Sequence, residues 1–507
     1  MSAATVRIRL EPLGIDIDVP HGTPLSEVLS AQDFEFPCGG LGTCAGCGVR
    51  ASAGSLPVTA EDRAAFSSEE LAHGWRLACQ AQATSPLVLE CGQWHMEVLA
   101  DDSVMHGAGK RGLGIAIDLG TTTIAAQMID LLSGDVLAVE TRLNPQSTSG
   151  SDVMSRIQAA ISGVNLTDTI RDTLGEIVKQ LSGGRVDEIA EIVLVGNTVM
   201  HHLFSGLDVE PLAHVPFVSP RLGEQHFSPE ELRWPLSERC SIRFLRCIGG
   251  FVGSDILAGI VATGMTERED LIALIDLGTN GEIAIGNRYG VVCASTAAGP
   301  AFEAGTIQMG MRAAAGAVAH VSLAGRTLHA SVIGHTEPRG ICGSGLVDAV
   351  AAGLADAAIL PSGRIADGSK VFPVVDPVVL YQSDIRELQL AKAAIASGFR
   401  LLLRRIGAEA HHLKKVHLAG AFGNYVQAES AIRIGLIEAP QERIEPAGNT
   451  ALRGAKHLLL ATQAPALPRI EHVSLASDPD FQSEFARCMT FPPFQNAVTT
   501  VVMHDPC

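Results

Sequence analysis

The stretch Ile115-Ala-Ile-Asp-Leu-Gly-Thr-Thr-Thr123 decides the fold of most of this chain, because it occurs a second time as Leu274-Ile-Asp-Leu-Gly-Thr-Asn-Gly-Glu282. Each copy predicts an apolar strand and an Asp-Leu-Gly-Thr turn. A second apolar strand then follows each turn, at 124–129 and at 283–286. One Asp-x-Gly-Thr turn is common in hairpins, so the prediction depends on the two matched copies.

Such a turn is suited to binding phosphate. Glycine lets the backbone approach closely, and successive N–H groups and threonine hydroxyls can then surround the phosphate oxygens. The aspartates of the two copies, Asp118 and Asp276, end their strands and can each hold a metal-bound water. Two such turns that face each other across a cleft can hold the phosphates of one nucleotide.

Two later segments are candidates for the lining of such a cleft. The stretch Val416-His-Leu-Ala-Gly-Ala-Phe-Gly-Asn424 follows a predicted helix over 383–407 and indicates a strand that ends in a Gly-x-x-Gly turn. The stretch Gly340-Ile-Cys-Gly-Ser-Gly-Leu346 precedes another predicted helix and either lines the cleft or is only a tight helix start. Asn197 follows a predicted strand over 192–196 and is a further candidate for the cleft.

A cysteine-rich loop indicates which cofactor the N-terminal region binds. Phe36-Pro-Cys-Gly-Gly-Leu-Gly-Thr-Cys-Ala-Gly-Cys-Gly48 has the spacing Cys-x5-Cys-x2-Cys, and a fourth cysteine follows at Cys79. Four thiolates are the ligand set of a [2Fe–2S] cluster, and glycines permit the tight turns that aim N–H groups at its sulfides. We predict that Cys38, Cys44, Cys47 and Cys79 bind this cluster. Around the loop, 5–19 predicts two strands, and Pro24–Ala31 a helix with Thr23 as its N-cap.

The alternative for the cysteine loop is a zinc site or a set of free thiols. A four-cysteine zinc site usually has two Cys-x2-Cys pairs, whereas this sequence has one such pair in a glycine-rich loop. Cys91 is interpreted as a small buried hydrophobic residue. The pair His201-His202 lies on an apolar stretch and is interpreted as packed or at the surface rather than metal-binding.

Composition excludes several classes of protein. A formal net charge of -18 disfavours nucleic-acid binding, which depends on neutralising phosphates with Lys and Arg. No apolar run is long enough for a membrane span, and Met1–Val19 lacks the pattern of a secretory signal. Eleven cysteines with cluster-like spacing favour a reducing compartment, so we expect a cytoplasmic protein.

The paired turns resemble the phosphate motifs of the ATPase superfamily that includes actin, hexokinase and the heat-shock chaperones. The resemblance implies an α/β fold: an N-terminal β-grasp [2Fe–2S] ferredoxin domain followed by a two-lobed, actin-like (ASKHA, ribonuclease H-like) ATPase. The expected divisions are a ferredoxin domain at 1–95, a linker at 96–112, and ATPase lobes at 113–265 and 266–507. The polar, glycine-rich stretch from Asp101 to Gly114 is the basis for the linker.

The combination resembles the reductive activators of corrinoid proteins over nearly the whole chain. The shared strings include the cysteine loop, Gly196-Asn-Thr-Val-Met-His-His202 and Ala297-Ala-Gly-Pro-Ala-Phe-Glu303. Larger members carry an additional domain between the ferredoxin domain and the ATPase. In this sequence only the short interval 94–112 separates the two, so we expect that domain to be absent. The resemblance implies that Asp118, Asp276 and Glu282 are catalytic. It implies that ATP with Mg²⁺ is bound by Gly120, Thr121, Thr122, Thr123, Gly278, Thr279, Asn280, Gly281, Gly343, Ser344, Gly420, Phe422, Gly423 and Asn424.

The resemblance also implies a reaction. Corrinoid methyl carriers work as Co(I), and occasional oxidation leaves inactive Co(II), which ATP-driven electron transfer through the cluster restores. The implied partners are the corrinoid protein of a methyltransferase system or a cobalamin-dependent methionine synthase, an upstream electron donor, and a second copy of the chain in a homodimer.

Two other functions stay open at the level of sequence. One is a small-molecule kinase with an iron–sulfur redox sensor, which would show substrate-dependent phosphoryl transfer. The other is a chaperone-like ATPase joined to a ferredoxin, which would bind clients without regard to a cofactor.

Overall fold

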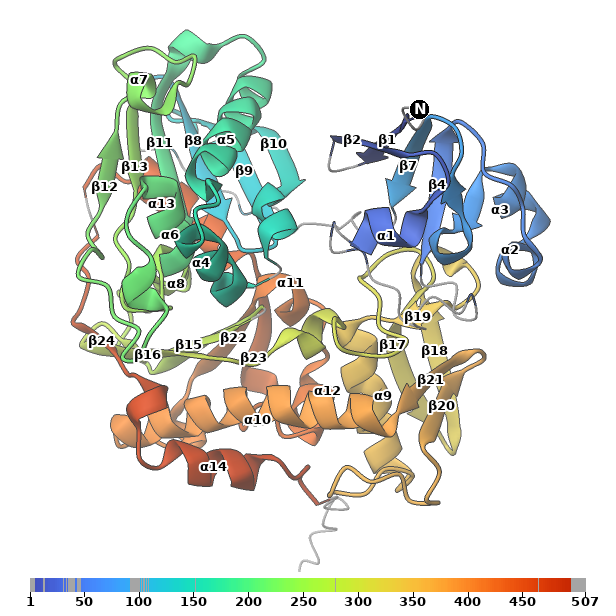
Figure 1. Ribbon diagram of the computed structural model, residues 1–507. Coiled ribbons are helices and arrows are strands. Elements are labelled where there is room, and N and C mark those ends of the chain that lie inside the picture. The colour runs from blue at the N-terminus through green and yellow to red at the C-terminus, as the bar shows by residue number, and fades with distance from the viewer. Residues whose placement is uncertain are drawn as a thin grey trace, which may run out of the picture.

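The computed structural model describes residues 5–11, 14–30, 32, 34, 42, 47–91, 101, 103, 105, 107, 109–150, 152–278, 280–463 and 465–493 of the 507. Three units, each built on one large sheet, make up the molecule (Figure 1). The N-terminal unit, residues 5–91, is at the upper right of the view. The first lobe is at the upper left, and the second lobe lies beneath both.

The N-terminal unit is a mixed five-stranded sheet, and helix α1 (Leu25–Ser30) packs on it. The central strand β1 pairs antiparallel with β2 and parallel with β7. Helix α1 buries Leu25 and Leu29 against Ile8 of β1. This is the β-grasp arrangement that the sequence predicts. In sheet order the strands are β2 (Ile15–Pro20), β1 (Thr5–Glu11), β7 (Leu87–Cys91), β4 (Gly48–Ala53) and β5 (Trp75–Leu77).

The predicted start of α1 is wrong by one residue. Thr23–Pro24 form a short strand, β3, that pairs with β6 (Gln82–Ala83). The Thr23 hydroxyl donates to the carbonyl of Pro20 at 2.7 Å rather than to the helix. The helix therefore begins after Pro24, because the preceding backbone is held extended by strand pairing.

The first lobe is a six-stranded sheet between helices. Alternate residues of β8 face opposite ways, so Ile117 packs against α5 (Leu166–Ser182) and Ala116 against α13 (Thr450–Leu460). Helix α13 thus returns from the end of the chain to cover the first lobe. In sheet order the strands are β10 (Val136–Leu143), β9 (Thr123–Asp130), β8 (Leu113–Leu119), β11 (Ile189–Gly196), β13 (Ser241–Phe244) and β12 (Gln225–Phe227).

The second lobe repeats this design. Three antiparallel strands, β16-β15-β14, are followed by the parallel strands β22 and β23, just as β10-β9-β8 are followed by β11 and β13. The internal repeat in the sequence is therefore a repeat in the structure. In sheet order the strands are β23 (Ile444–Gly448), β22 (Lys415–Ala419), β14 (Ile272–Leu277), β15 (Gly281–Asn287), β16 (Gly290–Thr296) and β24 (Ile470–His472).

Helix α8 (Ser254–Ala262) joins the two lobes. Its Ala258 packs in the core beneath the first sheet, whereas Ile256 and Ile260 pack against the second sheet. It also crosses α13 very closely, because a Cβ at Gly454 would lie 2.0 Å from the carbonyl oxygen of Ala258. The two helices therefore pack closely against each other where α8 joins the lobes.

The remaining elements complete the lobes. Helix α10 (Gln382–Arg405) confirms the helix predicted over 383–407 and covers the second sheet together with α9 (Gly343–Ala355). The other helices are α2 (Ala60–Ala65), α3 (Ser68–Ala72), α4 (Val153–Ile161), α6 (Thr198–Ser205), α7 (Pro229–Leu232), α11 (Gly420–Gly423), α12 (Ala428–Arg433) and α14 (Phe481–Cys488). The other strands are β17 (Ala317–Ala324), β18 (Thr327–Val332), β19 (Gly340–Ile341), β20 (Val371–Val375) and β21 (Val378–Tyr381).

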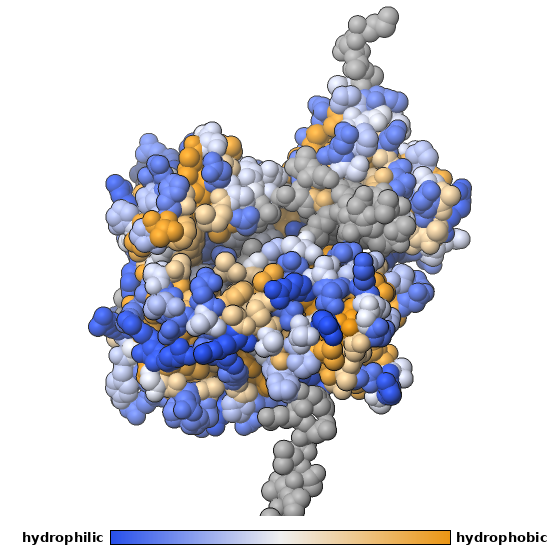
Figure 2. Space-filling model, turned by 60° about the horizontal axis from the view of Figure 1, so that its bottom comes forward, coloured by the Kyte–Doolittle hydropathy of each residue, from blue (hydrophilic) through white to orange (hydrophobic). Residues whose placement is uncertain are grey.

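The surface is mainly hydrophilic on the face turned forward in Figure 2, where apolar residues form separate patches. Among the described residues, no helix has both the length and the apolar character that a membrane crossing requires.

The described part of the predicted linker is bound to the first lobe by ion pairs and a hydrogen bond. Lys456 of α13, which is fully buried, forms an ion pair with Asp101 and donates to the carbonyl of Ser103 at 2.6 Å. Lys110 pairs with Glu191 of β11 at 3.0 Å. The described residues of the predicted linker therefore lie against the first lobe.

Candidate functional site

Each Asp-Leu-Gly-Thr turn bonds the N–H of its glycine to a backbone carbonyl, three residues ahead in the first turn and two residues ahead in the second. Gly120 donates its N–H to the carbonyl of Thr123 at 3.0 Å, and Gly278 donates to Asn280 at 3.1 Å. A Cβ at Gly120 would lie 2.5 Å from the carbonyl oxygen of Thr123, so this turn requires glycine. Asn197, at the start of α6, donates to the hydroxyl of Thr121 at 2.8 Å and thereby orients the first turn.

The predicted catalytic acids share one partly enclosed region between the lobes. Burial raises the pKa of Asp118 to about 6, although a hydrogen bond from Asn449 opposes the rise. Burial and the charge of Asp118 raise the pKa of Asp276 to about 7. Burial, with the charges of Asp255 and Asp276, raises the pKa of Glu282 well above its ordinary value. The structure thus brings the three predicted acids into one electrostatic cluster.

A fourth acid, Asp255, was missed by the sequence reasoning. It lies in the first turn of α8, and burial raises its pKa to about 8, with the charges of Asp276 and Asp118 adding to the rise. The hydroxyl of Ser254 bonds the backbone of Gly196 and fixes this helix start against the end of β11. In the sequence, Asp255 looks like any acid in a first helical turn, so no local signal marks it.

Asn449 is a second residue that the sequence did not indicate. Its side-chain amide donates to Asp118 Oδ2 at 2.9 Å, while its carbonyl oxygen accepts the N–H of Leu452 and caps α13. Because α13 returns to the first lobe, a residue more than 300 positions away orients the aspartate of the first turn. Only the tertiary fold brings these two residues together.

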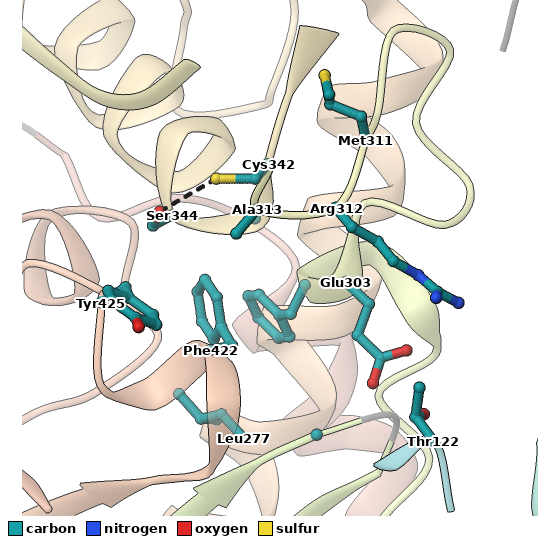
Figure 3. A pocket seen from close by; sticks show the side chains of 13 residues that line it. Thr122, Leu277, Glu303, Met311, Arg312, Ala313, Cys342, Ser344, Phe422 and Tyr425 are labelled. Atoms are coloured by element: carbon teal, nitrogen blue, oxygen red, sulfur yellow. Dashed lines mark hydrogen bonds between the residues drawn. The ribbon is translucent and has the colours of Figure 1, made fainter. Parts of the chain in front are cut away.

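A pocket of about 750 Å³, including its open mouth, joins the two turns to the segment that follows β22, which contributes Phe422 and Tyr425 (Figure 3). Phe302 and Phe422 stack with ring centroids 4.8 Å apart, and Tyr425 lies on the far side of Phe422. Glu303 and Arg312 lie near Thr122 at the opposite end. The pocket is lined by Thr122, Leu277, Gly278, Phe302, Glu303, Met311, Arg312, Ala313, Cys342, Gly343, Ser344, Phe422 and Tyr425.

This lining brings together Thr122, Gly278, Gly343, Ser344 and Phe422 of the residues predicted for nucleotide binding. Its aromatic end is suited to a purine, because bases stack on aromatic rings, and its other end reaches both turns. The sequence reasoning missed Phe302, Arg312 and Tyr425 as lining residues, because they are distant from either turn in the chain.

Other predicted nucleotide-binding residues lie around the pocket rather than in its lining. Gly420 has a φ of +83°, and a Cβ there would lie 2.6 Å from Asp276 Oδ1, so it packs directly on the second aspartate. The remaining residues are Gly120, Thr121, Thr123, Asn280, Gly281, Gly423 and Asn424, which belong to the turns or to α11 and its end. Thr279 lies outside the described residues. The predicted open Gly-x-x-Gly turn is instead the one-turn helix α11.

The acids fit a magnesium ion that keeps part of its water shell. Within the described ranges, no three acids, histidines or cysteines converge closely enough to ligate one ion directly. Mg²⁺ usually retains several waters and takes one or two carboxylates together with substrate phosphates. Buried acids with raised pKa values, such as Asp255 and Asp276, lack a compensating charge that such a cation would supply.

Two of the four predicted cluster ligands lie within the described residues. Cys47 immediately precedes β4, Cys79 follows β5, and the N–H of Ala78 donates to the carbonyl of Cys47 at 3.0 Å. A hydrogen bond from Cys47 lowers the pKa of Cys79 to about 6, and the side chain of Gln80 and the backbone of Gly42 assist. Cys38 and Cys44 lie outside the described residues.

This environment fits a metal cluster. The thiolate is the form that binds iron, and N–H groups aimed at the sulfurs are what a [2Fe–2S] site requires. The other described cysteines are buried thiols; burial raises the pKa of Cys247, for example, to about 12. Cys91 is fully buried in β7, which confirms its interpretation as a core residue.

The histidine pair is packed, which is one of the two predicted environments. His201 and His202 are both fully buried, and the ring of His202 bonds the hydroxyl of Ser219 at 2.7 Å and the carbonyl of Thr198 at 2.8 Å. Their bonds are internal to the first lobe.

Comparison with known families agrees with this architecture. Residues 8–84 match a 2Fe-2S iron-sulfur cluster binding domain. Residues 113–268 match the RACo middle region, and residues 270–502 match the C-terminal domain of RACo, described as the ASKHA domain. Fold, pocket and matches together define an iron–sulfur protein with an actin-like ATPase.

Known relatives specify the family. The chain is 35% identical to the corrinoid activation enzyme RamQ of Eubacterium limosum, over 73% of this chain and 68% of that protein. It is 29% identical to the [Co(II) methylated amine-specific corrinoid protein] reductase of Methanosarcina barkeri, over 68% of this chain and 70% of that one. A solved structure of a reductive activator for corrinoid, iron-sulfur protein superposes with a TM-score of 0.66 at 26% identity, covering 96% of this chain and 98% of that one. The chain belongs to the family of the corrinoid activation enzymes, which confirms the resemblance.

Proposed function

We propose that this chain is an ATP-dependent reductive activator, which returns a corrinoid protein from Co(II) to Co(I) by one-electron transfer. The observation that carries this proposal is the presence, in one chain, of a hydrogen-bonded Cys47–Cys79 pair and a pocket that joins two phosphate-type turns. The names of the relatives from Eubacterium limosum and Methanosarcina barkeri support it.

The N-terminal unit would serve electron transfer. When bound, a [2Fe–2S] cluster supplies one-electron chemistry at a potential that depends on the hydrogen bonds to its sulfurs. Cys38, Cys44, Cys47 and Cys79 would hold it. The donors at Gln80 and Gly42 stabilise negative charge on Cys79 and thereby influence that potential.

The two lobes would serve ATP hydrolysis. The turns at Gly120 and Gly278 would hold phosphate oxygens through their N–H groups, and Phe422 would contact the base. Asp255, which faces the charges of Asp276 and Asp118, would accept a proton from an attacking water only in the state in which a bound Mg²⁺ favours its carboxylate form. Asn449 keeps Asp118 in a fixed orientation, from which this carboxyl would hold a water bound to Mg²⁺.

ATP is needed because the reduction is uphill for ordinary donors. A mismatch of about 59 mV in a one-electron potential costs a factor of ten in the equilibrium. Binding or hydrolysis of ATP can supply the difference only if it favours a conformation in which the cobalt potential is higher.

The finer assignments are part of this proposal. We infer a ferredoxin domain at 1–95, a connecting segment at 96–112, and lobes at 113–265 and 266–507. The client would be the corrinoid protein of a methyltransferase system or a cobalamin-dependent methionine synthase. An upstream electron donor would reload the cluster, and the active form would be a homodimer. The reduced thiols of the described cysteines suit the cytoplasm.

Cobalt absorbance tests the proposal. A Co(II) corrinoid protein is incubated with the activator, Mg²⁺, ATP and a reductant too weak to act alone. Cys79→Ser and Asp276→Asn should each abolish Co(I) formation, the first by loss of the cluster and the second by loss of ATP turnover. The matched controls Cys91→Ala and Asp187→Asn should retain it. Reduction by both active-site variants at the parent rate would overturn the proposal.

The same samples address the alternative functions. A kinase would consume ATP in proportion to a phosphorylated small molecule, and a chaperone-like ATPase would respond equally to apo and corrinoid-loaded clients. Neither pattern is expected.

A further inference from the structure

Arg339 forms a polar contact between the N-terminal unit and the second lobe. Its side chain is 9% exposed and makes an ion pair with Glu70 of α3. The guanidinium also lies over two rings of the N-terminal unit, 5.0 Å from the centroid of Phe66 and 5.3 Å from that of Trp75. A cation enclosed by two aromatic faces and a carboxylate is held by three attractions that act together.

The N-terminal side of this contact is rigid and leads to the cluster. Glu70 uses its other carboxylate oxygen to accept the N–H of Ser67 at 2.9 Å and the Ser67 hydroxyl at 3.0 Å, so its orientation is fixed. Trp75 is the first residue of β5, and Cys79 lies two residues beyond the end of that strand. The ring of Trp75 is therefore only four residues from a predicted cluster ligand.

The lobe side of the contact leads to the nucleotide pocket. Arg339 immediately precedes β19 (Gly340–Ile341), and the next three residues, 342–344, line the pocket. The backbone of this segment is held in place. Ile341 forms backbone hydrogen bonds with Met309 and Met311, and Gly343 packs so closely that a Cβ there would lie 1.8 Å from the carbonyl oxygen of Phe302. Only the two residues of β19 therefore separate Arg339 from the pocket-lining residues 342–344.

The N-terminal unit touches the first lobe as well. Leu143, at the end of β10, packs against its core. The unit is thus held at Leu143 by one lobe and at Arg339 by the other. Any closure of the lobes on a nucleotide changes the distance between these two contacts, so the unit cannot keep both unchanged.

We propose that Arg339 is a positioning residue that docks the cluster-bearing unit on the nucleotide lobe, so that occupancy of the pocket is detected at Cys79. The inference rests on the proposed cluster and nucleotide sites but not on any corrinoid client. Coupling between two sites is reciprocal, so reduction of the cluster must alter nucleotide affinity by the same factor by which nucleotide alters the reduction equilibrium.

The experiment uses the full chain with its cluster loaded, purified without oxygen and without any corrinoid protein. The midpoint potential of the cluster is measured by redox titration with and without a non-hydrolysable ATP analogue, and nucleotide affinity is measured by calorimetry. In the parent, the analogue should change the ratio of oxidised to reduced cluster at fixed potential at least threefold. In Arg339→Gln the change should vanish, while cluster content and basal ATP hydrolysis stay within about twofold of the parent.

Three further variants make the test specific. Arg326→Gln removes an arginine of the same lobe whose side chain is 87% exposed, and it should behave as the parent. Glu70→Gln weakens the same contact from the other side and should also abolish the nucleotide effect, which covers the case in which Arg339→Gln fails to fold. The charge exchange Arg339→Glu with Glu70→Arg should restore part of the effect that either single change removes.

Hydrogen exchange over residues 66–77 gives a second readout. Exchange should depend on nucleotide in the parent and become faster and independent of nucleotide in Arg339→Gln. A nucleotide effect on the potential that survives both Arg339→Gln and Glu70→Gln would overturn the inference. So would a parent that binds nucleotide and holds its cluster but shows no effect of one on the other. Failure to bind nucleotide at all would instead contradict the proposed function.

Discussion

Replacing Asp255 with asparagine should stabilise the nucleotide-free protein although it impairs ATP hydrolysis. Burial and the charges of Asp276 and Asp118 raise the pKa of this carboxyl from 3.8 to about 8. At neutral pH the folded protein must therefore take up a proton that the unfolded chain does not carry. Three pKa units at about 1.4 kcal/mol each amount to roughly 4 kcal/mol, and partial exposure of the side chain reduces this to about 2 kcal/mol.

The sign of the pH dependence follows from the same shift. Because the folded pKa lies above the unfolded one, the folded state binds more protons, and stability falls as pH rises from about 4 to about 8. Asp255→Asn removes this contribution. The variant should match the parent near pH 4 and exceed it in stability by about 2 kcal/mol at pH 8.

Urea unfolding without nucleotide and with a chelator measures this effect. The fluorescence of Trp234, which is buried in the first lobe, reports on the relevant unit. Asp187→Asn, at an exposed site, is the control and should change stability by less than about 0.5 kcal/mol. The reasoning would be refuted if Asp255→Asn were less stable than the parent at pH 8. It would also be refuted if the variant changed the free energy of unfolding by the same amount at pH 4 and at pH 8.

Three further predictions concern other parts of the molecule. In cluster-free protein, alkylation of Cys79 should increase with pH around a midpoint near 6, because hydrogen bonds stabilise its thiolate; mass spectrometry of the alkylated peptide checks this, and a midpoint near 9 would contradict it. Phe422→Ala should weaken ATP binding about tenfold in calorimetry with little change in folding, since it removes one face of the stacked Phe302–Phe422 pair. Lys456→Met should destabilise the first lobe by about 3 kcal/mol, because it leaves Asp101 buried without its ion-pair partner, whereas the double change with Asp101→Asn should recover most of the loss. An unaltered unfolding transition in Lys456→Met would show that this ion pair does not hold the segment around Asp101 against the first lobe.

The sequence could predict what is local. The positions of Asp118 and Asp276 follow from a turn between two apolar strands, and the repeat of that pattern predicted the repeated sheet. Cys79 was found from the arrangement of the cysteines. Motifs and their spacing can be recognised directly in the sequence, so these features could be predicted before the fold was known.

The residues that the sequence did not reveal are brought together only by packing. Asp255 becomes part of the acid cluster because α8 crosses between the lobes, and Asn449 reaches Asp118 because α13 returns to the first sheet. Tyr425 and Phe302 line one pocket although 122 positions separate them in the chain. The ion pair between Asp101 and Lys456 could not be predicted for the same reason, since Lys456 lies near the other end of the sequence.

The claim that ATP drives electron transfer to cobalt can be tested in one titration. A Co(II) corrinoid protein, the activator and Mg²⁺ are poised with a mediator at a fixed potential at which about one cobalt in a hundred is Co(I), and absorbance is followed after ATP is added. We predict that the ratio of Co(I) to Co(II) rises at least tenfold, equivalent to about 59 mV or more, and returns to its starting value when ATP is exhausted. A ratio that reaches the same value with and without ATP would contradict the account.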